Sequence, residues 1–158
     1  GLLYIGEYSY TLTESGGSLA AGKGVMDTET ITQGHAFGSR PARVSFQYKY
    51  APIKNESFQA YATIENRDNG TIEIARAEVS AATAAAAVSE MTDLTLDFVY
   101  DERYKHVKAT HICIFFASST KMGWKEGDDR PATTNSGTAS MHYGSALTID
   151  NLKLDYTF

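Results

Sequence analysis

The sequence predicts an all-β protein, built as an antiparallel sandwich or barrel. Three observations support this fold class. Apolar residues recur with period 2, the period of a half-buried strand, far more often than with the helical period. The 158-residue chain holds ten Tyr and seven Phe, which favour strands. Turn signals separate about seven or eight short alternating runs. We therefore expect a jelly roll or a related β-sandwich.

The first elements show clear alternation. Apolar residues alternate at Leu3–Ile5 and again at residues 8–12, before a loop of small residues at 14–24. Residues 43–50 alternate strictly and lie between two prolines, as expected of a half-buried strand. Its apolar positions are Val44, Phe46, Tyr48 and Tyr50, and its polar positions are Arg43, Ser45, Gln47 and Lys49.

The strongest local signal is Asn69-Gly70, which lies between two alternating runs. Asn-Gly fits the tight turn of a β-hairpin, so we expect paired strands at about 57–65 and 71–79. The alanine-rich run at 81–88 has high helix propensity but is short and uncapped, and both a helical turn and an extended loop remain open.

The remaining elements are also strand-like. Residues 94–100 alternate, and 101–103 form a turn. Residues 111–116 are apolar at almost every position, which is typical of a central strand covered on both faces. A long polar loop, of a kind that is usually functional or mobile, follows at 118–143. In the closing run at 147–156 the apolar phase slips at Asp150-Asn151, which predicts a β-bulge.

Composition limits the function classes. At about 150 residues per domain, the chain is expected to form one domain, residues 1–158. The formal net charge of −5 argues against nucleic acid or an anionic membrane as a partner, since both require a basic surface. The single cysteine, Cys113, excludes an internal disulfide framework. No apolar run approaches the length of a transmembrane helix.

No catalytic motif stands out. His111 and Cys113 share a strand face, but no further ligands are spaced for zinc. Calcium prefers carboxylates and carbonyls of loops and bulges, so Asp150 is a candidate ligand for a structural calcium, with Asp128 and Asp129 in the long loop. The competing interpretation is that Asp150 only caps local amides.

Ligand binding by a sheet face is the best-supported hypothesis. If the strands at 43–50 and 57–65 pair, their polar positions form one surface. Sugars need planar hydrogen-bonding groups beside an aromatic ring. The alternatives are a plain solvated face and, for the single tryptophan, an anchor folded onto the core. The candidate ligand-binding residues are Trp124, Tyr61, Arg40, Gln47, Lys49, Gln59, Glu65 and Tyr143.

Four segments together resemble a known family. They are Gly1–Gly6, Ser39–Pro52 with its Arg-Pro and Tyr-Lys-Tyr-Ala-Pro elements, His111–Ser119, and Gly144–Leu154 with Gly-Ser-Ala-Leu-Thr-Ile-Asp-Asn-Leu. They look like the putative carbohydrate metabolism domain (PCMD) family of secreted proteins from glycan-degrading gut bacteria. The resemblance implies a jelly-roll domain similar to galactose-binding and carbohydrate-binding modules.

The resemblance carries further expectations. It implies export, often as an outer-membrane lipoprotein, and therefore an extracellular or outer-membrane location, with the periplasm also open. The family domain is longer at its N-terminus, so we expect opening strands of the domain to be missing from this chain. Asp150 matches the aspartate that helps to hold a structural calcium in related jelly rolls. No catalytic residue carries over.

Three functions follow. The first is a non-catalytic carbohydrate-binding or accessory module of glycan utilisation. The second is a glycoside-active enzyme, with Glu65, Asp128 and Asp129 as the first carboxylates to consider. The third is a structural module that binds other surface glycan-utilisation proteins, since missing strands would leave an exposed sheet edge.

Overall fold

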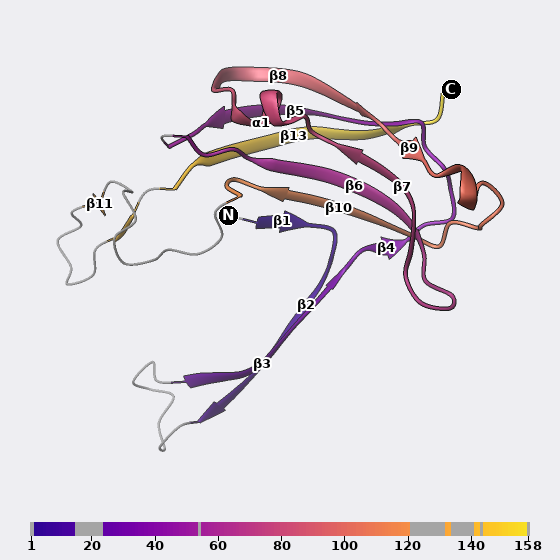
Figure 1. Cartoon of the computed structure of the whole chain (residues 1–158). Helices are drawn as coiled ribbons and strands as arrows, with labels where there is room; N and C mark the ends of the chain where they lie inside the picture. Colours follow the sequence, from indigo (N-terminus) through magenta and orange to yellow (C-terminus); the bar gives the residue numbers. More distant parts are fainter. Residues whose placement is uncertain are drawn as a thin grey trace.

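The protein is an antiparallel β-sandwich, as the sequence predicts (Figure 1). The computed structural model describes residues 2–14, 24–53, 55–120, 132–133, 141–142 and 144–157. Two sheets carry the core, and short connections run between them. Among the described residues, no helix has the length and apolar character needed to cross a membrane.

The first sheet contains six strands in the order β1-β10-β6-β7-β9, with β4 beside β10. Their bounds are β1 Leu2–Tyr4, β4 His35–Ala36, β6 Gln59–Asn66, β7 Ile72–Glu78, β9 Val99–Tyr100 and β10 His111–Ala117. The predicted hairpin at Asn69-Gly70 is confirmed, since β6 and β7 pair antiparallel across it. Gly70 has φ 94°, a conformation that glycine adopts without steric cost.

The second sheet contains three strands in the order β13-β5-β8. They are β5 Arg43–Ala51, β8 Val88–Asp97 and β13 Ala146–Asp155. The predicted bulge is confirmed: the β13–β5 register shifts between Asp150 and Lys153, and Asn151 has φ 53°. Asparagine tolerates this left-handed conformation better than most residues.

Smaller elements complete the chain. A hairpin of β2 (Gly6–Glu14) and β3 (Gly24–Gln33) points away from the two sheets (Figure 1). β3 is not among the strands that the sequence predicts, because its residues Asp27–Thr30 show no apolar alternation. The alanine-rich run contains α1 (Ala81–Ala85), where the Ser80 side chain caps the Thr83 amide. A 3-10 turn, η2 (Glu102–Tyr104), and the short pair β11 (Ala132–Thr133) and β12 (Met141–His142) are also present.

Aromatic side chains join the two sheets across the core. The Phe46 ring lies edge-on to Phe116, with centroids 5.0 Å apart. Phe58 contacts Tyr48 and Tyr50 at centroid distances of 5.4 and 5.0 Å. The tyrosines of β5 are therefore structural, as their strand phase predicts. Tyr156, just after β13, is half exposed and lies outside this core.

The apolar strand β10 is central, as expected. Every residue from Ile112 to Ala117 is buried. Its even-numbered side chains belong to the core cluster, whereas its odd-numbered side chains lie on the other face of the sheet, because successive side chains of a strand alternate. Polar and aromatic side chains of β6 and β7 shield that second face from solvent.

One prediction about strand pairing is wrong. The strands at 43–50 and 57–65 do not pair, because β5 lies in the three-stranded sheet and β6 in the six-stranded sheet. Their apolar faces meet across the core. Burial of these faces turns the polar side chains of the two strands outward, on opposite sides of the sandwich.

Candidate functional site

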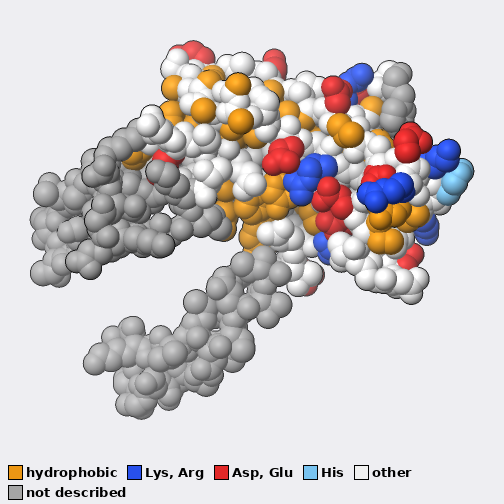
Figure 2. All heavy atoms as spheres, in the orientation of Figure 1, with side chains coloured by type: hydrophobic (Ala, Val, Ile, Leu, Met, Phe, Trp, Pro, Cys, Tyr) orange, Lys and Arg blue, Asp and Glu red, His pale blue; other side chains and the backbone are white. Residues whose placement is uncertain are grey.

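The outer face of the six-stranded sheet carries a cluster of aromatic and charged side chains. On β6, Tyr61 lies opposite Glu78 of β7, and Thr63 lies opposite Arg76. Cross-strand partners present their side chains on the same face. On the face turned to the viewer, acidic and basic side chains lie next to one another (Figure 2).

The Tyr61 ring has a neighbour on each flanking strand. It stacks on Phe115 of β10 with centroids 4.9 Å apart and planes 19° apart. The guanidinium carbon of Arg76 lies 4.7 Å from the ring centroid. Since β10 and β7 flank β6 on opposite sides, both ring faces are occupied. Tyr61 therefore offers a ligand its edge and hydroxyl group, and burial raises the pKa of that hydroxyl.

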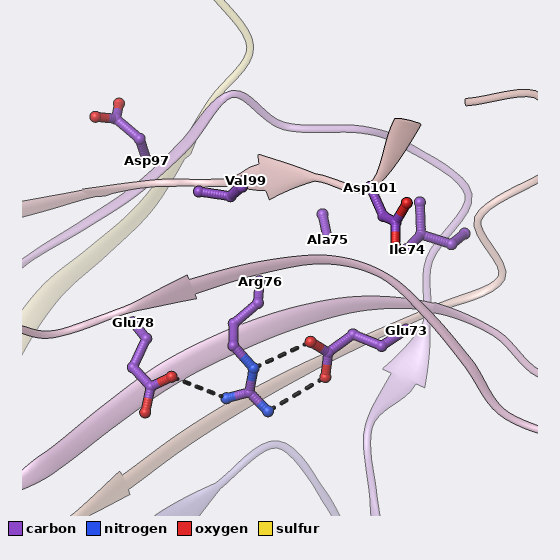
Figure 3. A pocket seen from close by; sticks show the side chains of 8 residues that line it. All are labelled: Glu73, Ile74, Ala75, Arg76, Glu78, Asp97, Val99 and Asp101. Carbon is purple, nitrogen blue, oxygen red and sulfur yellow. Dashed lines mark hydrogen bonds and ion pairs between the residues drawn. The ribbon is translucent and has the colours of Figure 1, made fainter. Parts of the chain in front are cut away.

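Arg76 is held between two glutamates (Figure 3). Its Nε donates to Glu73 Oε1 at 3.0 Å, and Nη2 donates to Glu73 Oε2 at 3.2 Å. Nη1 reaches Glu78 Oε2 at 3.4 Å. Burial lowers the pKa of Arg76, but the two carboxylates outweigh burial and the net shift is upward. All three side chains remain 39–45% exposed, so a ligand can reach them.

A hollow of about 420 Å³ lies beside this cluster. The described residues that line it include one cation, Arg76, and four carboxylates, from Glu73, Glu78, Asp97 and Asp101. Figure 3 shows Val99 on β9 and Asp101 just beyond the end of that strand, next to β7, which carries Arg76. Each carboxylate has an arginine partner, because Asp97 pairs with Arg43 and Asp101 with Arg103. The Arg103 hydrogen bonds hold the pKa of Asp101 below its usual value.

The sequence did not indicate the glutamate pair. Glu73 and Arg76 are three residues apart, a spacing that places side chains on opposite faces of a regular strand. The β6–β7 register shifts between Ile64 and Glu65, which leaves Ile74 as an extra residue on β7. The bulge brings Glu73 onto the face of Arg76. Two consecutive apolar residues inside β7, Ile74 and Ala75, were the available signal.

Glu65 belongs to a buried network rather than to the hollow. Its Oε1 accepts from the Thr63 hydroxyl at 2.8 Å, and its Oε2 accepts from Arg67 Nε at 2.8 Å. Burial raises the pKa of Glu65, but these hydrogen bonds and the Arg67 charge lower it further than burial raises it. Arg67 Nη2 also donates to Cys113 Sγ at 3.0 Å. This network covers the outer side of β10.

Gln47, Lys49 and Asp150 lie on the opposite surface, the outer face of the three-stranded sheet. Gln47 faces Asp150 in the β5–β13 register. Asn151 Nδ2 donates to Gln47 Oε1 at 2.8 Å, and its backbone N–H donates to Asp150 Oδ1 at 2.7 Å. In the part of the chain that the structure describes, no group of three or more His, Cys, Asp or Glu residues could hold a metal. Calcium at Asp150 stays a prediction.

The remaining candidates lie elsewhere. Arg40 Nη2 donates to the backbone carbonyls of Tyr104 and Val107 at 2.7 and 2.9 Å, and its guanidinium carbon lies 5.2 Å from the Tyr100 ring centroid. Burial raises the pKa of Tyr100 to about 12. Arg40 thus fastens the loop before β10. Gln59 begins β6, at the end of the Tyr61 face. Positions outside the described residues include Trp124, Tyr143, Asp128 and Asp129.

Comparison with known proteins supports the fold. No protein-family model matches the chain, and no curated protein matches it. Among solved structures, it is similar to a protein from Bacteroides thetaiotaomicron described as a "putative glycoside hydrolase", with a TM-score of 0.52 and 19% sequence identity. The match covers 81% of this chain and 42% of that protein. The chain therefore spans less than half the length of this similar protein.

Proposed function

We propose that the protein is a non-catalytic carbohydrate-binding or accessory module, and that it binds glycans on the outer face of its six-stranded sheet. The observation that carries the proposal is the position of the Arg76 guanidinium group. This fork of N–H donors is held between Glu73 and Glu78, beside Tyr61 and at the hollow of about 420 Å³. A sugar ring presents neighbouring hydroxyls that both donate and accept, and guanidinium and carboxylate groups match them in pairs.

Binding is favoured over catalysis by the arginine partners in the hollow. Glycoside hydrolysis needs one carboxylic acid that stays protonated near neutral pH and a second carboxylate facing it. The four carboxylates that line the hollow are each already paired with an arginine, and the Arg103 hydrogen bonds hold the pKa of Asp101 below its usual value. Glu65 is held by Arg67, and its lowered pKa is the opposite of what a general acid requires.

The wider biological setting is part of the same proposal. The structural neighbour is described as a "putative glycoside hydrolase", and a module that holds glycans would suit a protein of that kind. We place the protein in the PCMD family and in glycan utilisation, at the outer membrane as a lipoprotein or in the extracellular space. The resemblance of four sequence segments supports this placement.

Glycan-array screening followed by calorimetry with neutral oligosaccharides tests the proposal. Arg76→Gln removes the fork and should weaken binding about tenfold, since a hydrogen bond to a charged group contributes about 1.5–3 kcal/mol. Lys105→Gln is the matched control, because it makes the same charge change at an exposed position outside the hollow. Absence of any glycan binding, or full affinity in a folded Arg76→Gln variant, would overturn the proposal.

A further inference from the structure

A second hollow, of about 630 Å³, opens on the opposite side of the sandwich. It lies over the ends of β5, β8 and β13, and its volume falls in the range of small-molecule sites, roughly 300–1,000 Å³. Most of its wall is apolar or small. The lining residues are Lys49, Tyr50, Ala51, Pro52, Ala87, Val88, Ser89, Ala146 and Thr148.

A buried polar clasp fixes two walls of this hollow. The Ile53 amide donates to Ser145 Oγ at 2.9 Å, and the Ser145 hydroxyl donates to Glu56 Oε2 at 2.6 Å. Glu56 and Ser145 are only 5% and 6% exposed. Ile53 follows Pro52, and Ser145 precedes Ala146, so the clasp joins the β5 wall to the β13 wall. A wall fixed before binding lowers the entropic cost of holding a ligand.

The charge of the hollow is opposite to that of the protein. Among the described residues that line it, Lys49 is the only charged one, whereas the whole chain has a formal net charge of −5. None of the ion pairs between described residues involves Lys49. Its ammonium group therefore has three donors to offer an anionic ligand. Carboxylates lie near Lys49 by register: Asp150 of β13 and Asp93 of β8 both lie opposite Gln47, and Glu90 falls in the β8 segment opposite Lys49 where the register shifts.

The polar side chains of the hollow lie next to its apolar lining residues. Lys49 lies directly opposite Thr148 in the β5–β13 register, so the ammonium and hydroxyl groups project from the same face as neighbours. Ser89 adds a second exposed hydroxyl. The apolar groups of Pro52, Val88 and the alanines can pack against a C–H face of a ring. The ligand that fits is a ring with one carboxylate and flanking hydroxyls.

We propose that this hollow is a second glycan site, which binds a hexuronic acid unit through Lys49. The saccharide part of the inference rests on the proposed function, whereas the carboxylate part rests on the hollow itself. The ligand carboxylate accepts from the Lys49 ammonium, the Thr148 and Ser89 hydroxyls bond to ring hydroxyls, and the C–H face packs on Pro52 and its apolar neighbours. The two sites lie on opposite faces, so a glycan occupies each independently.

Calorimetry with three small probes tests the proposal on the whole chain: methyl glucuronide, methyl glucoside and cyclohexanecarboxylate. The glucuronide should bind about tenfold more tightly than the uncharged glucoside, as expected for a charge-assisted hydrogen bond. Lys49→Gln should remove that difference. Lys153→Gln, an exposed change of the same charge on the same strand pair outside the hollow, should preserve it. Arg76→Gln should also preserve it.

Equal affinity for glucuronide and glucoside, or unchanged glucuronide binding in Lys49→Gln, overturns the site. Cyclohexanecarboxylate binding as tightly as the glucuronide overturns its saccharide character. If neutral oligosaccharides fail to bind while glucuronide binds through Lys49, the proposed site at Arg76 fails and the second site stands.

Discussion

Replacement of Phe58 by alanine tests how the two sheets are held together. Phe58 is 1% exposed, and its ring contacts Tyr48 and Tyr50 of the opposite sheet at 5.4 and 5.0 Å between centroids. Full burial of a phenylalanine side chain contributes about 1.5–3 kcal/mol, and each aromatic pair adds about 0.5–1.5 kcal/mol. With the cavity that alanine leaves, the free energy of unfolding should fall by about 3–5 kcal/mol.

Urea denaturation and calorimetry measure this loss. For a chain of this length, 1 kcal/mol corresponds to about 2–4 °C in Tm, so Phe58→Ala should lower Tm by about 6–20 °C. Val99→Ala is the control, because Val99 is 75% exposed and its truncation should change stability by no more than about 0.5 kcal/mol. A loss below about 1 kcal/mol for Phe58→Ala, with an unchanged denaturant slope, would refute the packing of the two sheets through this ring.

Three further predictions concern the buried polar contacts. The pKa of Glu65 is lowered in the folded protein. The stability that ionised Glu65 contributes is therefore present above its unfolded pKa and is lost as the pH falls through its folded pKa. Between about pH 5 and 3, the free energy of unfolding should drop less steeply in Glu65→Gln than in the wild type. Gly34 has φ 100°, and an added Cβ would lie 2.8 Å from both Arg67 Nη2 and Cys113 Sγ. Gly34→Ala should therefore cost about 1–3 kcal/mol in urea denaturation, and a neutral result would contradict the close approach. Arg40→Ala leaves two backbone carbonyls without their charged donor and should cost about 1.5–3 kcal/mol; hydrogen exchange should rise in the loop before β10, and unchanged exchange there would argue against its anchoring role.

Local chemistry along the chain determined most of the secondary structure. Asn69-Gly70 encodes its hairpin because only a few residue types tolerate the turn conformation. The strands on either side of the turn are close in sequence, so each is the nearest available partner of the other. The phase slip at Asp150 encodes the β13 bulge, because a change of phase must be absorbed by an extra residue. The apolar run of β10 encodes burial on both faces of the sheet, because apolar side chains at successive positions point to opposite sides.

The alternation of a strand also determined which side chains point outward, including Tyr61, Gln47 and Lys49. It could not determine which strand lies alongside which. β5 and β6 have the same alternating pattern, and pairing in one sheet or packing across the core satisfies that pattern equally well. In the folded protein β5 and β6 pack against each other across the core. The single polar surface expected from their pairing is therefore divided between two opposite faces.

Only the tertiary structure decided the composition of the candidate sites. The bulge at Ile74 brought Glu73 beside Arg76, and the clasp between Ser145 and Glu56 joined segments 89 residues apart. Arg40, which the sequence offered for a ligand, is held by backbone carbonyls more than 60 residues away. The physical reason is common to all three. Periodicity records which face of an element is buried, whereas a site depends on distances between elements, and these are fixed only when the sheets pack.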